Sequence, residues 1–319
     1  MEHILQIGTG IVGKANIKGY KHYGFPVIAL DVIPEIIKNI NKEGIDCRHI
    51  NDNLNDLVDI SIILISVPTP LNKKKKRLSM DYVWSTINTV VKLIKISKKE
   101  IIIVMRSTVY PGLTREYEKL LQKYTNKKFY IAFQPEFLRA VTAEKDALYP
   151  WKVLFGYKKE DENVKNRMKN ILLKFVNNNE KHLRIMSLEE AEIHKCVHNY
   201  ANGMRISFAN SIYGLINNIN EKHNFNIDAQ HVLNNVSCTA ESFLNPKYGI
   251  RVGAPYGGVC LPKDCPELIN MAVDYNVDTR ISDFLNGTEE VNKWITENKE
   301  IQIKMDESPN LMSHNDLKK

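Results

Sequence analysis

The stretch APYGGVCLPKDC, from Ala254 to Cys265, combines residue types that could carry covalent chemistry. Cys260 follows a glycine pair closely, and Lys263 and Asp264 come within four residues of it. A thiolate is a strong nucleophile, a nearby cation stabilises it, and a carboxylate can orient water. We therefore predict that Cys260 is a nucleophile. Cys265 is either a second member of this site or a cap of the next helix.

The other cysteines do not suggest chemistry. Five cysteines form an odd set without a CxxC pair, which argues against a disulfide framework and against a structural zinc site. We expect reduced thiols and no metal, and we interpret Cys47, Cys196 and Cys238 as small apolar residues.

Two further segments offer polar groups that could join such a site. Lys195 and Asn199 are spaced i, i+4 in a predicted helix, so they share one face, although a helical lysine is usually solvated. Glu136 follows Pro135 just beyond a predicted strand, where a carboxylate can act as a general base or simply lie exposed in a loop.

The N-terminal segment predicts a dinucleotide site. Gly8, Gly10 and Gly13 form GTGIVG directly after the first predicted strand, and the second strand ends at Asp31, eighteen residues after Gly13. Glycines let the backbone approach a pyrophosphate at the helix N-terminus, and the acid accepts the ribose hydroxyls. Because Asp31 would repel a 2′-phosphate, we predict NAD as the cofactor.

Two later strand ends, SVPTP (Ser66 to Pro70) and RSTVYPG (Arg106 to Gly112), carry polar residues at the edge where a cofactor would lie. Each could be an ordinary turn.

The pattern of apolar runs predicts an α/β fold in residues 1–186, with a Rossmann-type, doubly wound parallel sheet. Five short apolar runs alternate with segments of helical length: HILQIG, FPVIALD, DISIILISV, EIIIVM and FYIAF. We expect an all-α domain in residues 187–298, which carries the cysteine, and a short polar tail in residues 299–319.

One long helix should begin after a capping box at Ser187 to Glu190 and run over residues 188–220. Its length suits packing against a second copy, so we expect a homodimer. Further helices are predicted over residues 228–236, 265–275 and 281–297.

Composition limits the partners. The 319 residues carry a net charge of +7, and the dense run Lys73 to Arg77 falls in a loop, where solvation explains it better than contact with nucleic acid or an anionic surface. No apolar run is long enough to span a bilayer, and the N-terminus lacks a signal pattern. We expect a cytoplasmic protein without membrane or nucleic-acid contacts.

In combination, the motifs resemble those of the UDP-glucose/GDP-mannose dehydrogenase family, the nucleotide-sugar 6-dehydrogenases. The segments that carry the resemblance are GTGIVG, SVPTP with LSMDYV, RSTVYPG, QPEFLRA with DALYPWKVLFG, AEIHKCVHNYANGMRISFANSI and PYGGVCLPKD. They follow the family order from Met1 to about Trp294.

The resemblance implies oxidation of a sugar C6 alcohol to a carboxylate with two NAD per turnover, through an aldehyde, a cysteine thiohemiacetal and a thioester. Cys260 would be the nucleophile, Lys195 and Asn199 would stabilise the oxyanion or hold the aldehyde, and Asp264 and Glu136 would handle protons and the hydrolytic water. The residues implied at the cofactor are Gly8, Gly10, Ile11, Val12, Gly13, Asp31, Thr69, Thr108 and Lys263. Those implied at the nucleotide-sugar substrate are Phe137, Leu138, Gly257 and, as a stand-in for an arginine of the family, Arg251.

The family pattern also implies a third, nucleotide-gripping domain near Lys299, where only about twenty residues remain. We therefore weigh an active enzyme, shortened or completed in trans, against a weakly active or inactive NAD-binding paralogue that serves as a dimeric partner. A one-step dehydrogenase of the 6-phosphogluconate type would use Lys195 and Asn199 but not Cys260.

Overall fold

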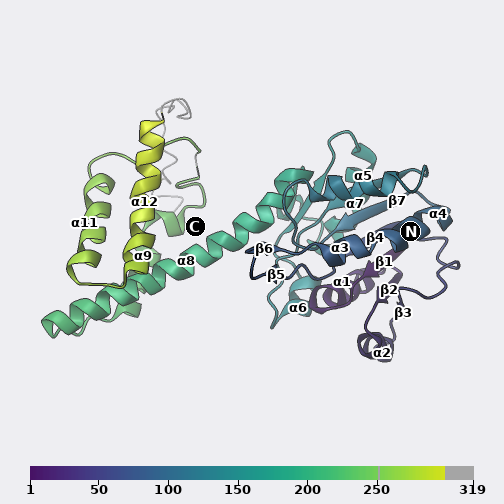
Figure 1. The fold of residues 1–319 in the computed structure, drawn as a ribbon, viewed down its shortest axis with the longest axis horizontal. Coiled ribbons are helices and arrows are strands. Elements are labelled where there is room, and N and C mark those ends of the chain that lie inside the picture. Colours follow the sequence, from purple (N-terminus) through teal and green to yellow (C-terminus); the bar gives the residue numbers. More distant parts are fainter. Residues whose placement is uncertain (251, 299–319) are drawn as a thin grey trace. The chain divides into compact units, whose positions relative to one another are not determined.

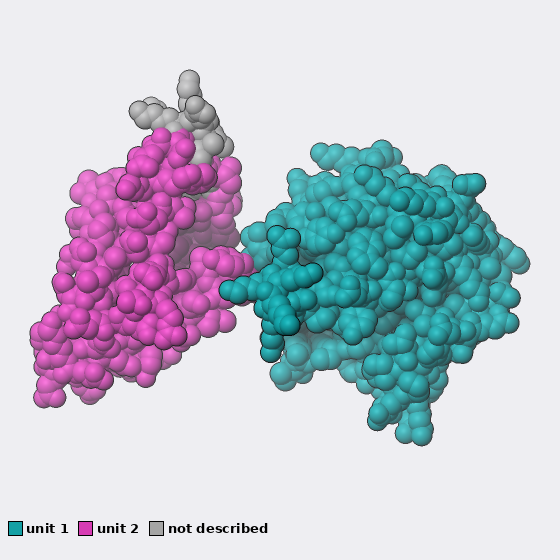
Figure 2. Space-filling model, viewed as in Figure 1, with its two compact units in different colours: residues 1–199 teal, residues 200–319 magenta. Residues whose placement is uncertain are grey.

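The computed structural model describes residues 1–250 and 252–298, which form two compact units. The units are Met1–Asn199 and Tyr200–Lys319, shown in separate colours in Figure 2. Helix α8 (Leu188–His223) begins in the first unit and continues into the second. Each unit is described below by itself.

The first unit is built on an eight-stranded sheet with the order β10-β9-β8-β7-β4-β1-β2-β3 (Figure 1). The strand bounds are β1 Ile4–Ile7, β2 Val27–Asp31, β3 Cys47–His49, β4 Ile62–Ile65, β7 Ile101–Met105, β8 Phe129–Phe133, β9 Val153–Tyr157 and β10 Leu183–Ser187. The helices of this unit before α8 are α1 Ile11–His22, α2 Pro34–Lys42, α3 Asp81–Ser85, α4 Ile87–Ile96, α5 Leu113–Gln122, α6 Ala143–Leu148 and α7 Glu162–Phe175, with a 3₁₀ turn at Glu180–His182.

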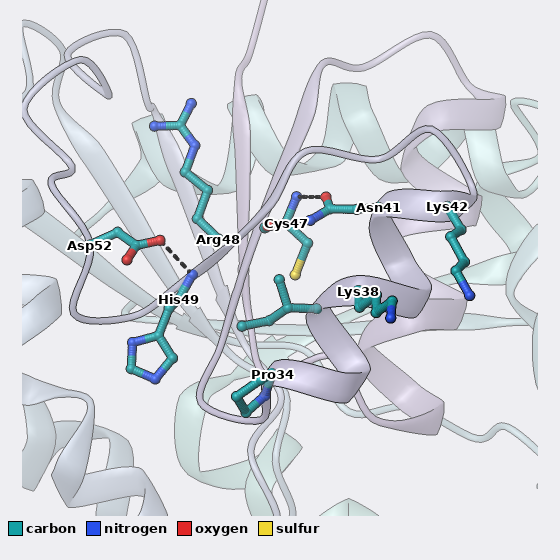
Figure 3. A pocket seen from close by; sticks show the side chains of 9 residues that line it. Pro34, Lys38, Asn41, Lys42, Cys47, Arg48, His49 and Asp52 are labelled. Atoms are coloured by element: carbon teal, nitrogen blue, oxygen red, sulfur yellow. Dashed lines mark hydrogen bonds between the residues drawn. The ribbon is translucent and has the colours of Figure 1, made fainter.

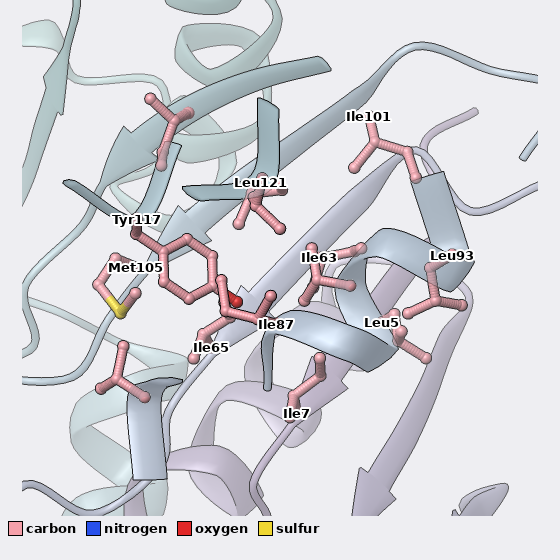
Figure 4. Close-up of a cluster of buried hydrophobic side chains, with 14 of the residues drawn as sticks. Leu5, Ile7, Ile63, Ile65, Ile87, Leu93, Ile101, Met105, Tyr117 and Leu121 are labelled. Atoms are coloured by element: carbon pink, nitrogen blue, oxygen red, sulfur yellow. The ribbon is translucent and has the colours of Figure 1, made fainter. Parts of the chain in front are cut away.

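Helices cover both faces of the sheet because its central strands are apolar on both sides. In β4, Ile63 and Ile65 face a core formed with α3, α4, α5 and the first turn of α8, while Ile62 and Leu64 face α1 and α7. Figure 4 shows part of the first core, with Tyr117 of α5 among the strand isoleucines. Burying one such side chain stabilises the fold by roughly 1.5–3 kcal/mol. The predicted doubly wound α/β fold is confirmed.

The sheet differs from the prediction at both edges, because β3 at one edge and β9 and β10 at the other were not predicted. All five predicted strands are present, and six strands from β3 to β8 run parallel, but β9 pairs antiparallel with β8 through Ala132 and Tyr157. The connection from β8 to β9, which contains the short helix α6, begins and ends at the same edge of the sheet. Strand β9 therefore runs in the direction opposite to β8. The two-stranded hairpin of β5 (Leu71–Asn72) and β6 (Arg77–Leu78), which carries the Lys73 to Arg77 run at its turn, was not predicted.

The long helix is confirmed as α8, and its capping box is formed. The backbone N–H of Ser187 donates to Glu190 Oε2 at 2.8 Å, and the N–H of Glu190 lies 3.4 Å from Ser187 Oγ. These reciprocal bonds satisfy donors that the first turn of a helix leaves free, so they fix where α8 begins.

The second unit packs the rest of α8 against helices from the C-terminal part of the chain. These are α9 Ala229–Thr239, α10 Glu241–Leu244, α11 Leu261–Asp274 and α12 Thr279–Glu297. Leu215 and Ile219 of α8 bury with Ala272, Val277 and Leu285. Helix α11 begins four residues earlier than predicted, and the predicted tail lies outside the described residues. Among the described residues, no helix is long and apolar enough to cross a membrane.

Candidate active site

The predicted cofactor residues of the first unit lie at the carboxyl edge of the parallel strands. Segments leaving β1, β2, β4, β7 and β8 carry, in turn, the glycine turn at Gly8, Asp31, Ser66 to Thr69, Arg106 to Thr108 and Gln134 to Glu136. Parallel strands place these ends side by side, which is where open α/β sheets bind ligands.

The glycine turn has the geometry that a dinucleotide needs. Gly8 has a φ of +81°, and a Cβ on Gly13 would lie 1.9 Å from the Gly8 carbonyl oxygen, so both positions require glycine. At Gly10 a Cβ would meet nothing within 4 Å, which leaves the surface beside the α1 N-terminus open to a pyrophosphate. Ile11 and Val12 form the first turn of α1 beside this surface. The turn therefore fits NAD.

Asp31 is held rigidly at the end of β2. Its Oδ2 accepts from the Thr9 N–H at 2.7 Å and the Thr9 hydroxyl at 2.6 Å, and its Oδ1 accepts from the N–H groups of Val32 at 2.7 Å and Ile33 at 3.0 Å. Four donors fill the lone pairs of the carboxylate. A ribose hydroxyl that binds Asp31 must replace one of them, and the Thr9 hydroxyl is the donor that can rotate away.

A buried polar layer beneath α1 supports the turn, and the sequence did not reveal it. Gln6 of β1 donates to the carbonyls of Ile7 at 2.9 Å and Gly8 at 3.0 Å, and Asn16 of α1 donates to Gln6 at 3.2 Å and to Ser66 Oγ at 3.1 Å. A sequence signal for this polar layer is a polar residue inside an otherwise apolar segment, as Gln6 is in HILQIG.

The segment after β7 is tied to the segment after β4. Ser107 Oγ donates to the Val67 carbonyl at 2.7 Å, so the stretches that carry Thr69 and Thr108 are neighbours. Both threonines are partly buried. Arg106, which we had not singled out, is buried, and its Nε has no hydrogen-bond partner. Burial lowers the pKa of Arg106, and the nearby Tyr20 and Glu136 oppose this effect.

Lys195 and Glu136 form a buried ion pair at the same edge. Lys195 of α8 is 5% exposed, and its Nζ lies 3.0 Å from Glu136 Oε1 and also donates to the Glu136 carbonyl. The other carboxylate oxygen of Glu136 accepts from the Leu138 N–H at 2.7 Å, and the Phe137 ring centroid lies 5.3 Å from Lys195 Nζ. Asn199 lies one turn further along α8 and is exposed.

Glu192, on the helical turn before Lys195, is another residue that we did not predict. It is fully buried and accepts from the Gly112 N–H at 2.6 Å, the Thr114 N–H at 3.0 Å and the Thr114 hydroxyl. Burial raises the pKa of Glu192, and these hydrogen bonds counteract the shift. Glu192 thus caps α5 and ties the segment after β7 to the helix that carries Lys195.

Cys260 is the N-cap of α11 in the second unit. Its carbonyl accepts from the N–H groups of Lys263 at 3.1 Å and Asp264 at 2.9 Å, and its side chain is exposed. Lys263 and Asp264 form an ion pair with each other. Gly257 lies in an open stretch, since a Cβ there would meet no atom within 4 Å. The N-terminal end of a helix favours negative charge, which suits a thiolate.

The predicted site residues divide between the two units. Lys195, Asn199, Glu136, Phe137 and Leu138 belong to the first, together with the cofactor residues other than Lys263. Cys260, Lys263, Asp264 and Gly257 belong to the second. Arg251 lies outside the described residues.

A pocket of about 890 Å³ lies elsewhere in the first unit, between α2 and β3, and contains no predicted catalytic residue (Figure 3). Its thiol, Cys47, is buried, and burial with the nearby Asp31 raises the pKa of Cys47 to about 11. The Asn41 side chain accepts from the Cys47 N–H at 2.8 Å and donates to its carbonyl at 2.9 Å. This amide covers the free edge of β3, which indicates a structural role.

Comparison with known proteins identifies the family. Residues 2–176 match the NAD-binding domain of the UDP-glucose/GDP-mannose dehydrogenase family, and residues 189–294 match its central domain. A UDP-glucose 6-dehydrogenase of Campylobacter jejuni is 27% identical over 97% of this chain and 76% of its own length. One of Rickettsia typhi is 28% identical over 88% of this chain and 64% of its own length.

The fold agrees with a solved relative. The structure of a ternary complex of GDP-mannose dehydrogenase from Pseudomonas aeruginosa matches with a TM-score of 0.79 at 24% identity, over 93% of this chain and 69% of that one. The resemblance of the motifs and the prediction of NAD are thus confirmed. The chain belongs to the UDP-glucose/GDP-mannose dehydrogenase family of NAD-dependent oxidoreductases.

Proposed function

We propose that this chain oxidises the C6 alcohol of a nucleotide sugar to a carboxylate in two steps, with Cys260 as the nucleophile. The observation that carries the proposal is the exposed Cys260 thiol at the N-terminus of α11, with Asp264 in the first turn. A one-step alcohol dehydrogenase has no chemical use for a thiol there, whereas oxidation to an acid does.

The proposed reaction consists of two oxidations at C6 followed by one hydrolysis. In the first oxidation the C6 hydroxyl loses its proton to a base and C6 loses a hydride, which yields an aldehyde. The Cys260 thiolate then adds to the aldehyde carbon, and loss of a second hydride gives a thioester. Water adds to the thioester, Cys260 leaves as a thiolate, and the acid is released. The glycine turn and Asp31 would hold NAD, which would supply the hydride acceptor for each oxidation.

Each remaining group has a role that its chemistry suits. The ammonium of Lys195 and the amide of Asn199 can stabilise an oxyanion at C6, since a buried cation acts strongly on developing charge. Glu136, which pairs with Lys195, and Asp264 can accept protons and orient the hydrolytic water. Ile11, Val12, Thr69, Thr108 and Lys263 are proposed at the cofactor.

We propose a UDP or GDP sugar as the substrate, bound by the residues Phe137, Leu138, Gly257 and Arg251. The relatives carry the names UDP-glucose and GDP-mannose dehydrogenase, and both substrates present a primary alcohol at C6.

We also propose that the chain is divided into domains at residues 1–186 and 187–298, followed by the tail. The free thiols of all five cysteines suit the reducing cytoplasm, where we place the protein.

We propose a homodimer formed through α8. Ile193, Val197, Tyr200 and Met204 follow one another at steps of three or four residues, and each is exposed by 45% or more of its surface. An apolar stripe of this length on a helix is unusual on a monomer and is typical of an interface.

The test mixes purified protein with NAD and a panel of UDP and GDP sugars and records NADH formation. We expect turnover with at least one sugar and none when NAD or the sugar is omitted. NAD binding by calorimetry without turnover of any sugar would contradict the proposed activity and favour the role of an inactive NAD-binding partner.

A further inference from the structure

Tyr256 lies four residues before Cys260, and two hydrogen bonds join it to α12. The Tyr256 N–H donates to Asn292 Oδ1 at 2.8 Å, and its hydroxyl donates to the Glu289 carboxylate. Glu289 and Asn292 are three residues apart on α12, so they lie on one face of that helix. A single residue therefore fastens the backbone and the side chain of this segment to α12.

Among the described residues, few contacts hold the chain between Tyr256 and Cys260. Val259 is 82% exposed, Gly258 has a φ of +81°, and a Cβ on Gly257 or Gly258 would meet no atom within 4 Å. Two adjacent glycines have the greatest backbone freedom of any pair of residues. The path of this stretch thus depends on what is fixed at its two ends.

The downstream end is fixed by the first turn of α11. The Cys260 carbonyl accepts the N–H groups of Lys263 and Asp264, at 3.1 Å and 2.9 Å, and this fixes the Cys260 backbone at the N-terminus of α11. The upstream end is fixed at Tyr256. If that end were released, the glycine pair would allow Cys260 to leave the N-cap position, and α11 would fray by one turn.

The Tyr256 hydroxyl is suited to a permanent anchor. Burial, the Glu289 carboxylate and the neighbouring Cys265 thiol raise the pKa of Tyr256 well above its ordinary value. The phenol therefore stays protonated at physiological pH and remains a donor to Glu289. Replacement by phenylalanine removes this bond and keeps the ring.

We propose that Tyr256 is a positioning residue that keeps the Cys260 thiol at the N-terminus of α11 by tying the preceding segment to α12. The inference rests on the proposed function, in which Cys260 is the nucleophile. It assigns Tyr256 no contact with substrate or cofactor.

The test measures the reactivity of the thiol itself. The full chain is treated with iodoacetamide, which forms a bond from Cys260 sulfur to carbon as iodide leaves and the thiol proton passes to solvent. Peptide mass spectrometry then gives a rate for each cysteine. In Tyr256→Phe we expect the rate at Cys260 to fall more than threefold, because the thiol loses the helix N-terminus. The rate at Cys238, an exposed cysteine of α9, should stay unchanged.

The matched control is Tyr248→Phe, a tyrosine of the same segment that is 37% exposed. It should retain the parent rate at Cys260. A Tyr256→Phe protein that folds by circular dichroism and alkylates Cys260 within threefold of the parent overturns the proposal. If that variant does not fold, Asn292→Ala, which removes the backbone anchor, is judged by the same threshold.

The reaction with iodoacetamide needs neither NAD nor sugar, so its result is independent of turnover. Failure of the proposed function would show instead as unchanged NADH formation in Cys260→Ser. In the steady state, Tyr256→Phe should lower kcat and leave the Kd for NAD at the parent value.

Discussion

Individual residues of the candidate active site form hydrogen bonds with more than one partner. Asp31 is the clearest example, because its four acceptor positions are all used by donors of the chain. The carboxylate is therefore fixed in place before any ribose reaches it. In the proposed complex with NAD, this arrangement would reduce the entropy lost on binding, and the Thr9 hydroxyl would be the group displaced by the ribose.

We expect Asp31→Asn to weaken NAD binding by about tenfold or more, since a hydrogen bond to a charged group contributes roughly 1.5–3 kcal/mol. The amide nitrogen cannot accept, so the variant also loses part of the Thr9 contact. Calorimetric titration with NAD measures the change, with Asp52→Asn, at an exposed carboxylate that accepts from the His49 N–H, as the control. Equal affinity in Asp31→Asn and the parent would contradict the assignment of Asp31 to the ribose.

At the scale of elements, α8 organises the carboxyl edge of the sheet through charged residues on its buried side. Lys195 pairs with Glu136 after β8, and Glu192 caps α5 beyond β7. One helix thereby fixes the positions of two segments that descend from neighbouring strands.

Removal of the Glu192 side chain, which caps α5, should lower the stability of the fold strongly. Glu192→Ala leaves the N–H groups of Gly112 and Thr114 and the Thr114 hydroxyl without their acceptor, so we expect the free energy of unfolding to fall by about 2–4 kcal/mol. Urea denaturation measures it. Glu189→Ala, which removes the partially exposed ion pair with Arg115, should cost no more than about 1 kcal/mol. Similar losses in the two variants would refute the capping role.

A histidine pair on α8 should make stability depend on pH. Burial lowers the pKa of His194, with a further contribution from His198, and burial and Lys195 lower the pKa of His198, which Glu136 opposes. The unfolded chain then binds protons more readily than the folded chain near pH 6.5. The stability from the neutral histidines is complete above that pH and declines as the pH falls through the folded-state pKa.

We therefore expect the melting temperature of the parent to drop more steeply between pH 7.5 and pH 5 than that of a double variant, His194→Asn with His198→Asn. His231→Asn, at an exposed position of α9, serves as the control. Parallel pH profiles for the parent and the double variant would show that these histidines titrate alike in both states.

The elements that the sequence predicted well are those with strong periodic patterns. The five apolar strands, the glycine turn and α8 with its capping box depend on contacts within a few residues, or on runs that only a buried strand satisfies. The reversed strand β9 could not be predicted in this way, because VLFGY is equally apolar on both faces and its direction depends on how α6 returns the chain.

The same reasoning applies to the site. Lys195 and Asn199 were paired by helical spacing, but the ion pair of Lys195 with Glu136 joins residues 59 positions apart. The role of Glu192 could not be predicted, because a glutamate on a helix is usually solvated and only the tertiary fold shows that it caps α5. The burial of Arg106 could not be predicted from the motif RSTVYPG, because an arginine at a strand end is usually exposed.

At the scale of the whole molecule, the exposed apolar stripe on α8 predicts self-association. We expect the parent to sediment as a dimer, with twice the 36.7 kDa mass of the chain. Val197→Lys with Met204→Lys should give a folded monomer, because two charges would be buried without partners. Glu221→Lys near the end of α8 is the control. A monomeric parent would contradict the proposed interface.

In the proposed reaction, the Cys260 thiol allows a second oxidation to follow the first. The most direct test counts the NADH formed per sugar consumed, in the parent and in Cys260→Ser, with the sugar that supports turnover. We predict two NADH per sugar for the parent. For Cys260→Ser we predict no more than one, since a neutral serine hydroxyl is a poor nucleophile and an alkoxide is a far poorer leaving group than a thiolate. Two NADH per sugar from Cys260→Ser at the parent rate would contradict the account.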